Sequence, residues 1–411
     1  MNFIFPLINF IQPGSLWLEL AQYRPMIILG ALALFVGLRR RCEYNRNDAF
    51  RHPMFKCIVF FLIAQVLSVR YGGGSAMLEE LNAWIGYLMF PMVTLALLTD
   101  VAQVRKFVWG MIAGGMWIVV YGIYALIYKV GFAAVGRAGA YGMYENHNDY
   151  TFIILQILPF IYLYSRHETS FLKRMLLYLS LATCVVGVLL SLSRGGILAL
   201  LLEGLLVIIF AMTNPRRWLL IPLLVIIGAG AIGYQWAKRA ANSTTYTAED
   251  AESSRYELWR AARNMIIAKP LLGVGSRRFH EYSQEYGELS HDQLGKNSHN
   301  TYLEILATSG LFGFIPFFLM GRYLIREMRQ RPPPNTPDII EATGKATLIA
   351  FVTILFRAMF DAKTYDWSFY TLAVIAIACV MLRGTEQEEA PVTYTPPPYP
   401  IPPRGAGSVY G

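Results

Sequence analysis

The sequence predicts an all-α integral membrane protein of about twelve transmembrane helices, with one large loop that holds short amphipathic helices. The chain of 411 residues is 55% hydrophobic and only 15% charged, whereas about a quarter of a soluble domain is charged. Apolar runs of about 20 residues, the length that crosses a bilayer, recur along the chain. They cover residues 2–20, 24–39, 54–70, 82–99, 107–128, 150–165, 174–191, 195–212, 218–236, 300–321, 339–360 and 367–383.

The first predicted unit, residues 1–236, contains the spans from 2–20 to 218–236. Its first span has the weakest pattern because Pro6 and Pro13 interrupt it, and proline disrupts a helix interior. The second unit, residues 237–299, is the only hydrophilic stretch of domain size. Within it, the pattern over 255–269 predicts an amphipathic helix that Pro270 stops, and 277–285 predicts a second short helix.

The apolar face of the helix over 255–269 carries Leu258 and Trp259. Such a helix is typical of one lying at a membrane interface. The third unit, residues 300–383, holds the last three spans, and residues 384–411 form a tail rich in proline and tyrosine. This composition predicts disorder or polyproline II conformation, with docking of assembly partners as an open alternative.

Positive charge is concentrated in alternate loops, which predicts the orientation of the chain. By the positive-inside rule these loops, and both termini, lie in the cytoplasm, so the large loop lies on the opposite face. The net charge of +9 is then mostly a topology signal, and we expect membrane lipids and not nucleic acid as partners. The basic residues are Arg39, Arg40, Arg41, Arg46, Arg51, Lys56, Arg105, Lys106, Arg166, Lys173, Arg174, Arg216, Arg217, Arg322, Arg326, Arg329 and Arg331.

Arg194, in the segment Ser193-Arg194-Gly195-Gly196, lies at the junction of two predicted spans. A charged side chain in the centre of a membrane helix costs about 2.5 to 3.5 kcal/mol on insertion scales, so it indicates a functional site. The alternative is that Arg194 only anchors a helical hairpin by reaching the lipid headgroups.

A second polar cluster, Asn297 to Glu304, stands where the large loop re-enters the membrane. His299 in this cluster is suited to accept a proton near neutral pH, although an ordinary interfacial histidine would give the same pattern. Glu304 is a further buried-charge candidate, whose alternative role is to pair with Arg194 or Arg357. Lys345 and Arg357 in the next span are also costly in lipid unless they pair or reach the headgroups.

A third polar cluster, Tyr144 to Tyr150, opens the span at 150–165 on the same face. Its amide, carboxylate and imidazole groups, with Asn146, His147 and Asn148 among them, can bind sugar hydroxyls. The equally weighted alternative is a polar helix start with Asn148 or Asp149 as its N-cap. His147 is a possible rival to His299 as a catalytic base. No DxD, HExxH or paired-carboxylate pattern is present, so we expect chemistry without a metal or other cofactor.

With these residues the chain resembles the O-antigen ligase family of bacterial inner-membrane glycosyltransferases, which is related to O-antigen polymerases and protein O-oligosaccharyltransferases. The motifs that carry the resemblance keep a fairly specific order and spacing around the large loop. They are Ser191-Leu-Ser-Arg-Gly-Gly196, Arg255 in Ser-Ser-Arg-Tyr-Glu-Leu-Trp, Pro270-Leu-Leu-Gly-Val-Gly275, His299-Asn-Thr-Tyr-Leu-Glu-Ile-Leu306 and Ser309-Gly-Leu-Phe-Gly313.

The resemblance implies a twelve-span fold of the glycosyltransferase C type in the bacterial inner membrane, with its active site facing the periplasm. It implies metal-independent, inverting transfer of a glycan from an undecaprenyl-diphosphate carrier to an acceptor hydroxyl, on lipid A-core or on another glycan. Arg194 and Arg255 would bind the diphosphate, and His299 would orient or deprotonate the acceptor. Guanidinium groups suit this role because they bind phosphate oxygens through two hydrogen bonds at once. The substrate-pocket candidates are Ser193, Asn300, Tyr302, Glu304, Asn146, Asn148 and His147.

Three other functions stay open at the level of sequence. A polymerase that extends the same lipid-linked glycan would carry the same motifs. A lipid or solute transporter could also use buried Arg, Lys and Glu side chains, but it predicts polar residues near the membrane midplane and an internal repeat. A non-catalytic assembly subunit would leave Arg194, Arg255 and His299 without a shared pocket.

Overall fold

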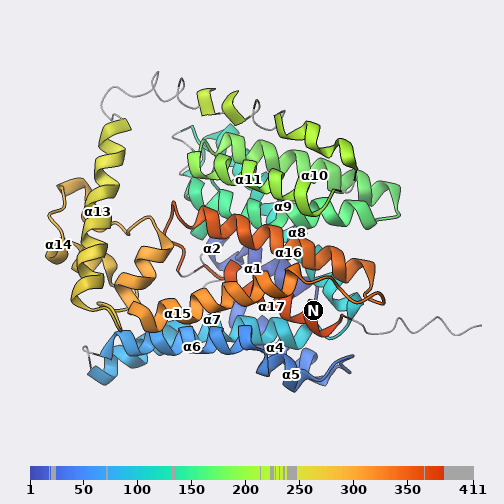
Figure 1. Ribbon diagram of the computed structural model, residues 1–411, viewed down its shortest axis with the longest axis horizontal. Helices are drawn as coiled ribbons and strands as arrows, with labels where there is room; N and C mark the ends of the chain where they lie inside the picture. Colours follow the sequence, from blue (N-terminus) through green and yellow to red (C-terminus); the bar gives the residue numbers. More distant parts are fainter. Residues whose placement is uncertain are drawn as a thin grey trace, which may run out of the picture.

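The computed structural model describes residues 1–383 apart from 18, 20–24, 71–72, 132, 134–135, 213, 223–225, 227, 231, 235–236, 238–247 and 365. Within these residues the regular structure is entirely helical (Figure 1). The predicted all-α class is therefore confirmed. The predicted tail, 384–411, and most of the start of the large loop lie outside the described residues.

Five of the described helices are long and apolar enough to cross a membrane. Three shorter apolar helices and two further helices lie beside them. The predicted spans from 24–39 to 195–212, and from 300–321 to 367–383, each overlap one of these ten helices. The long helices are α7 (Gly73–Leu97), α8 (Val101–Tyr128), α10 (Phe171–Leu190), α15 (Thr301–Arg329) and α16 (Asp338–Arg357). The shorter apolar helices are α4 (Pro25–Arg39), α6 (Pro53–Ser68) and α17 (Ser368–Met381). The other two helices are α9 (His147–His167) and α11 (Arg194–Phe210).

The prediction of one continuous span over 2–20 was wrong. Helix α1 (Ile4–Ile11) ends at Gln12, which has left-handed backbone angles, and the short helix α2 (Pro13–Leu16) follows it. Proline lacks the N–H that would continue the helical hydrogen bonds, and eight residues of helix cover only about 12 Å. A 3-10 turn, η4 (Pro215–Leu219), overlaps the start of the predicted span 218–236. Many residues of this span lie outside the described part of the chain.

Helix α17 occupies the centre of the bundle. All its residues from Ser368 to Cys379 are buried. It packs against α16, α7, α15 and α6, while α9 and α11 cover the other side of α16. Figure 1 shows this arrangement, with α9, α10 and α11 on one side and α4, α6 and α7 on the other. The last two helices, α16 and α17, therefore lie between these two groups.

The large loop forms a small helical unit at one end of the bundle (Figure 1). Helix α13 (Ala248–Ala268) confirms the predicted helix, and α14 (Phe279–Tyr286) confirms the shorter one. Leu258 and Met265 on the apolar face of α13 are buried in a separate cluster that includes Phe279 and Ala307, whereas Trp259 stays 38% exposed. Much of this face therefore packs against its own chain, and its expected place at a membrane interface stays a prediction.

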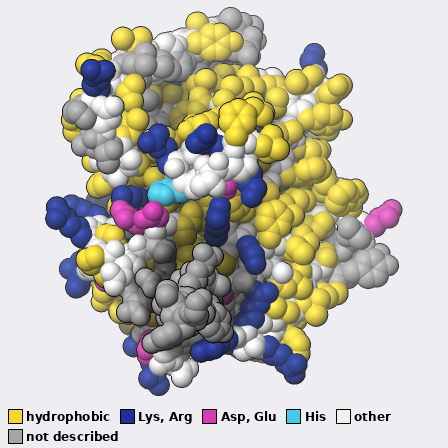
Figure 2. Space-filling model, turned by 90° about the vertical axis from the view of Figure 1, so that its right-hand side faces the viewer, with side chains coloured by type: hydrophobic (Ala, Val, Ile, Leu, Met, Phe, Trp, Pro, Cys, Tyr) yellow, Lys and Arg dark blue, Asp and Glu magenta, His cyan; other side chains and the backbone are white. Residues whose placement is uncertain are grey.

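Basic side chains gather at the opposite end of the bundle. Figure 2 looks at this end, where Lys and Arg side chains lie beside an apolar flank. Two short connections of this end join α9 to α10 and α15 to α16, and they carry basic residues of the predicted cytoplasmic set. The bundle thus has one basic end and one end that carries α13 and α14.

Helix α15 is sharply bent at Gly310, where φ is 60° and ψ is −159°. A Cβ at this position would lie 2.4 Å from the carbonyl carbon of Leu271, so only glycine fits. The N–H groups of Leu311 and Phe312 bond instead to the carbonyls of Pro270 and Leu271, at 2.9 and 3.1 Å. The bend changes the direction of α15 between the first turns, which begin at Thr301, and the rest of the helix.

Candidate functional site

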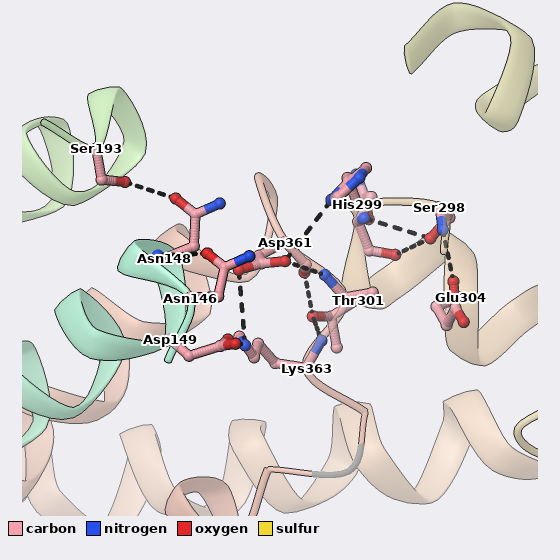
Figure 3. Close-up of polar contacts among 12 residues, drawn as sticks. Asn146, Asn148, Asp149, Ser193, Ser298, His299, Thr301, Glu304, Asp361 and Lys363 are labelled. Atoms are coloured by element: carbon pink, nitrogen blue, oxygen red, sulfur yellow. Dashed lines mark hydrogen bonds and ion pairs between the residues drawn. The ribbon is translucent and has the colours of Figure 1, made fainter. Parts of the chain in front are cut away.

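The candidate site lies where the N-terminal ends of α9, α11 and α15 meet the loop that follows α16 (Figure 3). Each helix N-terminus carries a partial positive charge, and its first backbone N–H groups need partners from outside the helix. The loop after α16 contributes Asp361 and Lys363. This end of the bundle therefore combines anion-attracting helix ends with fixed charges of both signs.

Ser193 caps the N-terminus of α11 and ties it to α9. Its Oγ accepts a hydrogen bond from the N–H of Gly196 at 3.2 Å and donates one to Oδ1 of Asn148 at 2.8 Å. Leu192, just before the cap, has left-handed backbone angles with φ at 53°. Arg137 stabilises this turn, because its guanidinium donates to the carbonyls of Ser191 and Leu192 at 3.0 and 2.9 Å.

Arg194 follows the cap directly and begins α11. It is partly exposed, and among the residues that the structure describes it forms no ion pair. A guanidinium at a helix N-terminus without a carboxylate partner leaves its charge available for an anion from outside.

The two glycines after Arg194 allow close packing of α11. A Cβ at Gly195 would lie 3.2 Å from Nη1 of Arg357, and one at Gly196 would lie 2.9 Å from the Thr151 side chain on α9. Arg357, the last residue of α16, is only 1% exposed. The backbone next to Arg194 therefore rests on a second, buried guanidinium.

Asp361 is the carboxylate that connects the cationic groups of the site. Its oxygens lie 3.6 Å from Nη2 of Arg357, 3.6 Å from Nζ of Lys363 and 3.8 Å from Nδ1 of His299. Lys363 also pairs with Asp149 of α9. A buried carboxylate with several cationic neighbours is compensated for its loss of hydration. Asp361 thus joins the end of α16 to the turn that carries His299.

Lys363 lies in the loop between α16 and α17 and is largely buried. Burial lowers the pKa of its ammonium group to about 8, because loss of hydration disfavours the charged form; the negative charge of Asp366 opposes this effect. This lysine therefore changes its charge within a mildly alkaline range, close to the groups that Asp361 connects.

His299 is held in an uncommon backbone conformation, with φ at 52°. Asn300 then caps α15, because its Oδ1 accepts from the N–H groups of Tyr302 and Leu303 at 3.0 and 3.1 Å. The His299 side chain is 35% exposed. It is therefore fixed by the turn and by Asp361 on one side and open to solvent or substrate on the other.

Ser298 links this turn to α13 and to Glu304. Its carbonyl accepts a hydrogen bond from Nε1 of Trp259 at 2.9 Å, and its N–H donates to Oε2 of Glu304 at 2.9 Å. Glu304 was considered a partner for Arg194 or Arg357, but its carboxylate caps the N–H of Ser298. Lys345 pairs with Glu341 one turn earlier, at 2.6 Å.

Arg255 lies on α13 and is partly buried. Gly195, next to Arg194, packs against Arg357, and His299 lies beside Asp361. The pair of Arg357 and Asp361 thus lies between the segments that carry Arg194 and His299, whereas Arg255 is carried by the separate helix α13.

The remaining predicted residues have mainly structural contacts. Asn146 caps α9 by accepting from the N–H of Asn148 at 2.8 Å, so the expected cap at Asn148 or Asp149 was wrong. His147 is the first residue of α9. The hydroxyl of Tyr302 donates to the carbonyl of Leu355 at 2.8 Å. Asn148 also accepts a hydrogen bond from Ser193, the residue that caps α11.

Sequence reasoning did not place Arg137, Asp361 and Lys363 in the site. Asp361 and Lys363 stand in a short loop between two apolar spans. In the sequence, positive and negative residues within a few positions of Arg357 could have indicated a buried network of charges. Arg137 offered no sign, because its hydrogen bonds go to a turn far along the chain.

Among the residues that are described, no group of three or more His, Cys, Asp or Glu side chains is arranged to hold a metal ion. Residues 179–318 match the family model described as O-antigen ligase. This part of the chain is similar to the O-antigen ligase family. No curated protein matches the sequence.

The matched part contains Arg194, Arg255 and His299 and ends within α15. Asn146, Asn148, Asp361 and Lys363 lie outside the matched residues, although they surround the same region. The match supports a likeness to O-antigen ligase-like and polymerase-like proteins. The site therefore includes residues of the matched part and residues supplied by flanking helices.

Proposed function

We propose that the protein is an O-antigen ligase-like glycosyltransferase that moves a glycan from an undecaprenyl-diphosphate carrier to an acceptor hydroxyl on lipid A-core or another surface glycan. The reaction takes place on the periplasmic face of the inner membrane, with both termini of the chain in the cytoplasm. The observation that carries this proposal is the contact of the Arg357–Asp361 pair with Gly195 on one side and His299 on the other. Through this contact, the start of α11, where we place the anion-binding Arg194, and the candidate base His299 lie beside the same pair of side chains.

Arg194 and Arg255 bind the diphosphate of the donor. Negative charge builds on this leaving group as the bond between the sugar and the phosphate oxygen breaks, and nearby guanidiniums stabilise that charge. The N-terminus of α11 adds its own partial positive charge. A carrier held in the membrane presents its diphosphate at headgroup depth, which explains why the cations stand at the end of the bundle.

His299 accepts the proton of the acceptor hydroxyl as that oxygen attacks the anomeric carbon. The new carbon–oxygen bond forms on the face opposite the departing diphosphate, so the configuration is inverted. Asp361, near Nδ1, orients the ring and stabilises its protonated form. The sugar hydroxyls bind to polar groups at the ends of α9 and α15, where Ser193, Asn148 and Asn300 are candidates. The reaction requires no metal.

The test is transfer by the purified, reconstituted protein with an undecaprenyl-diphosphate glycan and candidate acceptors. We compare wild type with Arg194→Ala, Arg255→Ala and His299→Asn, because asparagine tolerates left-handed backbone angles but accepts no proton at neutral pH. Each variant should lose at least about a hundredfold in rate, as loss of one charge-stabilising or acid–base group commonly does. Arg216→Ala, at an exposed basic residue outside the site, is the matched control.

Product formation by either Arg194→Ala or His299→Asn at the wild-type rate would refute the assignment of that residue. A longer lipid-linked glycan as the product would identify a polymerase instead of a ligase. Loss of activity on adding a chelator, with recovery on adding a divalent cation, would contradict the metal-independent mechanism.

A further inference from the structure

We propose that a groove along α15 binds one anionic phospholipid from the leaflet at the basic end of the bundle. The groove has a volume of about 750 Å³ and is lined mainly by α15, with Leu355 of α16 at its side. One end of the groove begins at Tyr302, near the start of α15, and the other end lies at Arg329 and Gln330. The proposal rests on the apolar wall of this groove, its length, and the charges at one end.

The apolar wall of the groove follows one stripe of α15. Phe314, Phe318 and Ile325 line it at helical spacing, and Phe318 is 58% exposed. Gly321 forms a low point in this stripe where α15 approaches Phe351 of α16. An exposed aromatic groove on a membrane helix faces hydrocarbon, so its natural occupant is an acyl chain.

Three arginines line the other end of the groove. Arg322, Arg326 and Arg329 are exposed and recur at intervals of four and three residues, which places them on one face of the helix. Within the described part of the chain, none of them has an ion pair. Three uncompensated guanidiniums that end an apolar groove are complementary to a phosphate headgroup with its chain in the groove.

The stretch of the groove from Phe314 to Arg322 fits within one leaflet. The helical rise of 1.5 Å per residue puts Phe314 about 12 Å from Arg322 along the axis. Half of a hydrocarbon core about 30 Å thick is about 15 Å. A lipid with its phosphate at the arginines would therefore place its acyl chain beside Phe318 and Phe314 without leaving its own leaflet.

The alternative is that these arginines only set the orientation of the chain, because the positive-inside rule needs a basic loop and no defined lipid site. A lipid site differs from such a loop in one respect: its binding depends on the headgroup charge of the lipid and on the shape of the groove. The probes are dioleoylphosphatidylglycerol and dioleoylphosphatidylcholine, added to the full-length protein in neutral detergent. Bound lipid is counted by native mass spectrometry over a titration.

Wild type should bind the anionic lipid at least about tenfold more tightly than the zwitterionic one. The triple variant R322Q/R326Q/R329Q should lose this preference, and Ile325→Trp should weaken binding by filling the groove. The control is R41Q/R51Q/K56Q, which removes three exposed basic residues of the same predicted loop set outside the groove. Thermal unfolding midpoints of all variants show that each one is folded.

Equal binding of the two lipids by wild type, or unchanged binding by the triple glutamine variant, would overturn the proposal. An equal loss in the control would show that general positive charge, and not the groove, attracts the lipid. Arginine-dependent binding of undecaprenyl phosphate without binding of phosphatidylglycerol would assign the groove to a polyprenyl lipid and refute the phospholipid assignment.

Discussion

The guanidinium of Arg357 packs against the backbone of Gly195, where a Cβ would lie 3.2 Å from Nη1. This contact sets the distance between α11 and the end of α16. It also places Arg194 beside the pair that Arg357 forms with Asp361. The glycine after Arg194 is therefore required by the packing of a buried arginine.

A larger side chain at Gly195 should separate these two helices. Gly195→Val would force Arg357 and Phe360 away from α11, since both lie within 3.4 Å of the new Cβ. We expect the transfer rate to fall by about tenfold or more, in line with the effect of small misplacements on catalysis. The measurement is transfer by the reconstituted enzyme.

Gly86→Val on α7 is the matched control for this substitution, because no atom lies within 4 Å of a Cβ built there. This control should keep wild-type activity. An unchanged rate in Gly195→Val would mean that the contact with Arg357 does not position Arg194.

Asp361 and Arg357 should be strongly coupled in stability. Asp361→Asn leaves the buried Arg357 charge without its carboxylate, and breaking a buried pair in this way costs about 3 to 5 kcal/mol. Arg357→Met with Asp361→Asn removes both charges and should be less destabilised than Asp361→Asn alone. The thermal unfolding midpoints of the single and double variants in detergent check this. Additive effects would contradict direct coupling.

The buried Lys363 should make stability depend on alkaline pH. Burial lowers the pKa of its ammonium in the folded protein from 10.5 to about 8. Between these pH values the unfolded chain binds more protons, so the free energy of unfolding rises as pH increases, by on the order of 3 kcal/mol in full.

Lys363→Arg stays protonated throughout this range and should lack the rise. Unfolding midpoints at pH 7.5 and pH 10 measure the difference. Lys345→Arg, at a half-exposed lysine of α16 that pairs with Glu341, should behave like wild type. Identical pH profiles for wild type and Lys363→Arg would show that Lys363 does not titrate as its burial indicates.

Trp259 should couple α13 to the catalytic turn. Trp259→Phe keeps an aromatic ring but removes the hydrogen bond to the carbonyl of Ser298, which is worth about 1 kcal/mol. We expect a several-fold lower transfer rate, with a small change in unfolding midpoint, because the turn before His299 becomes less constrained. Trp218→Phe, outside the site, serves as the control. A rate equal to wild type would mean that the turn is held without α13.

By itself the sequence determined the helices and most of their boundaries. Apolar runs and helix-stopping residues such as Pro270 act over a few residues, so they can be read locally. The same reasoning marked Arg194 and His299 as charged or titratable groups at span ends. It failed at 2–20, where the left-handed Gln12 before Pro13 divides an apolar run into two short helices.

Only the tertiary structure decided which polar groups meet. Asp361 and Lys363 follow α16, yet they contact His299 at the start of α15 and Asp149 at the start of α9. The apolar face of α13 looked suited to a membrane, but Leu258 and Met265 on it are buried against α14 and α15. Hydropathy reports only that a side chain tends to leave water, and the tertiary packing determines which element covers it.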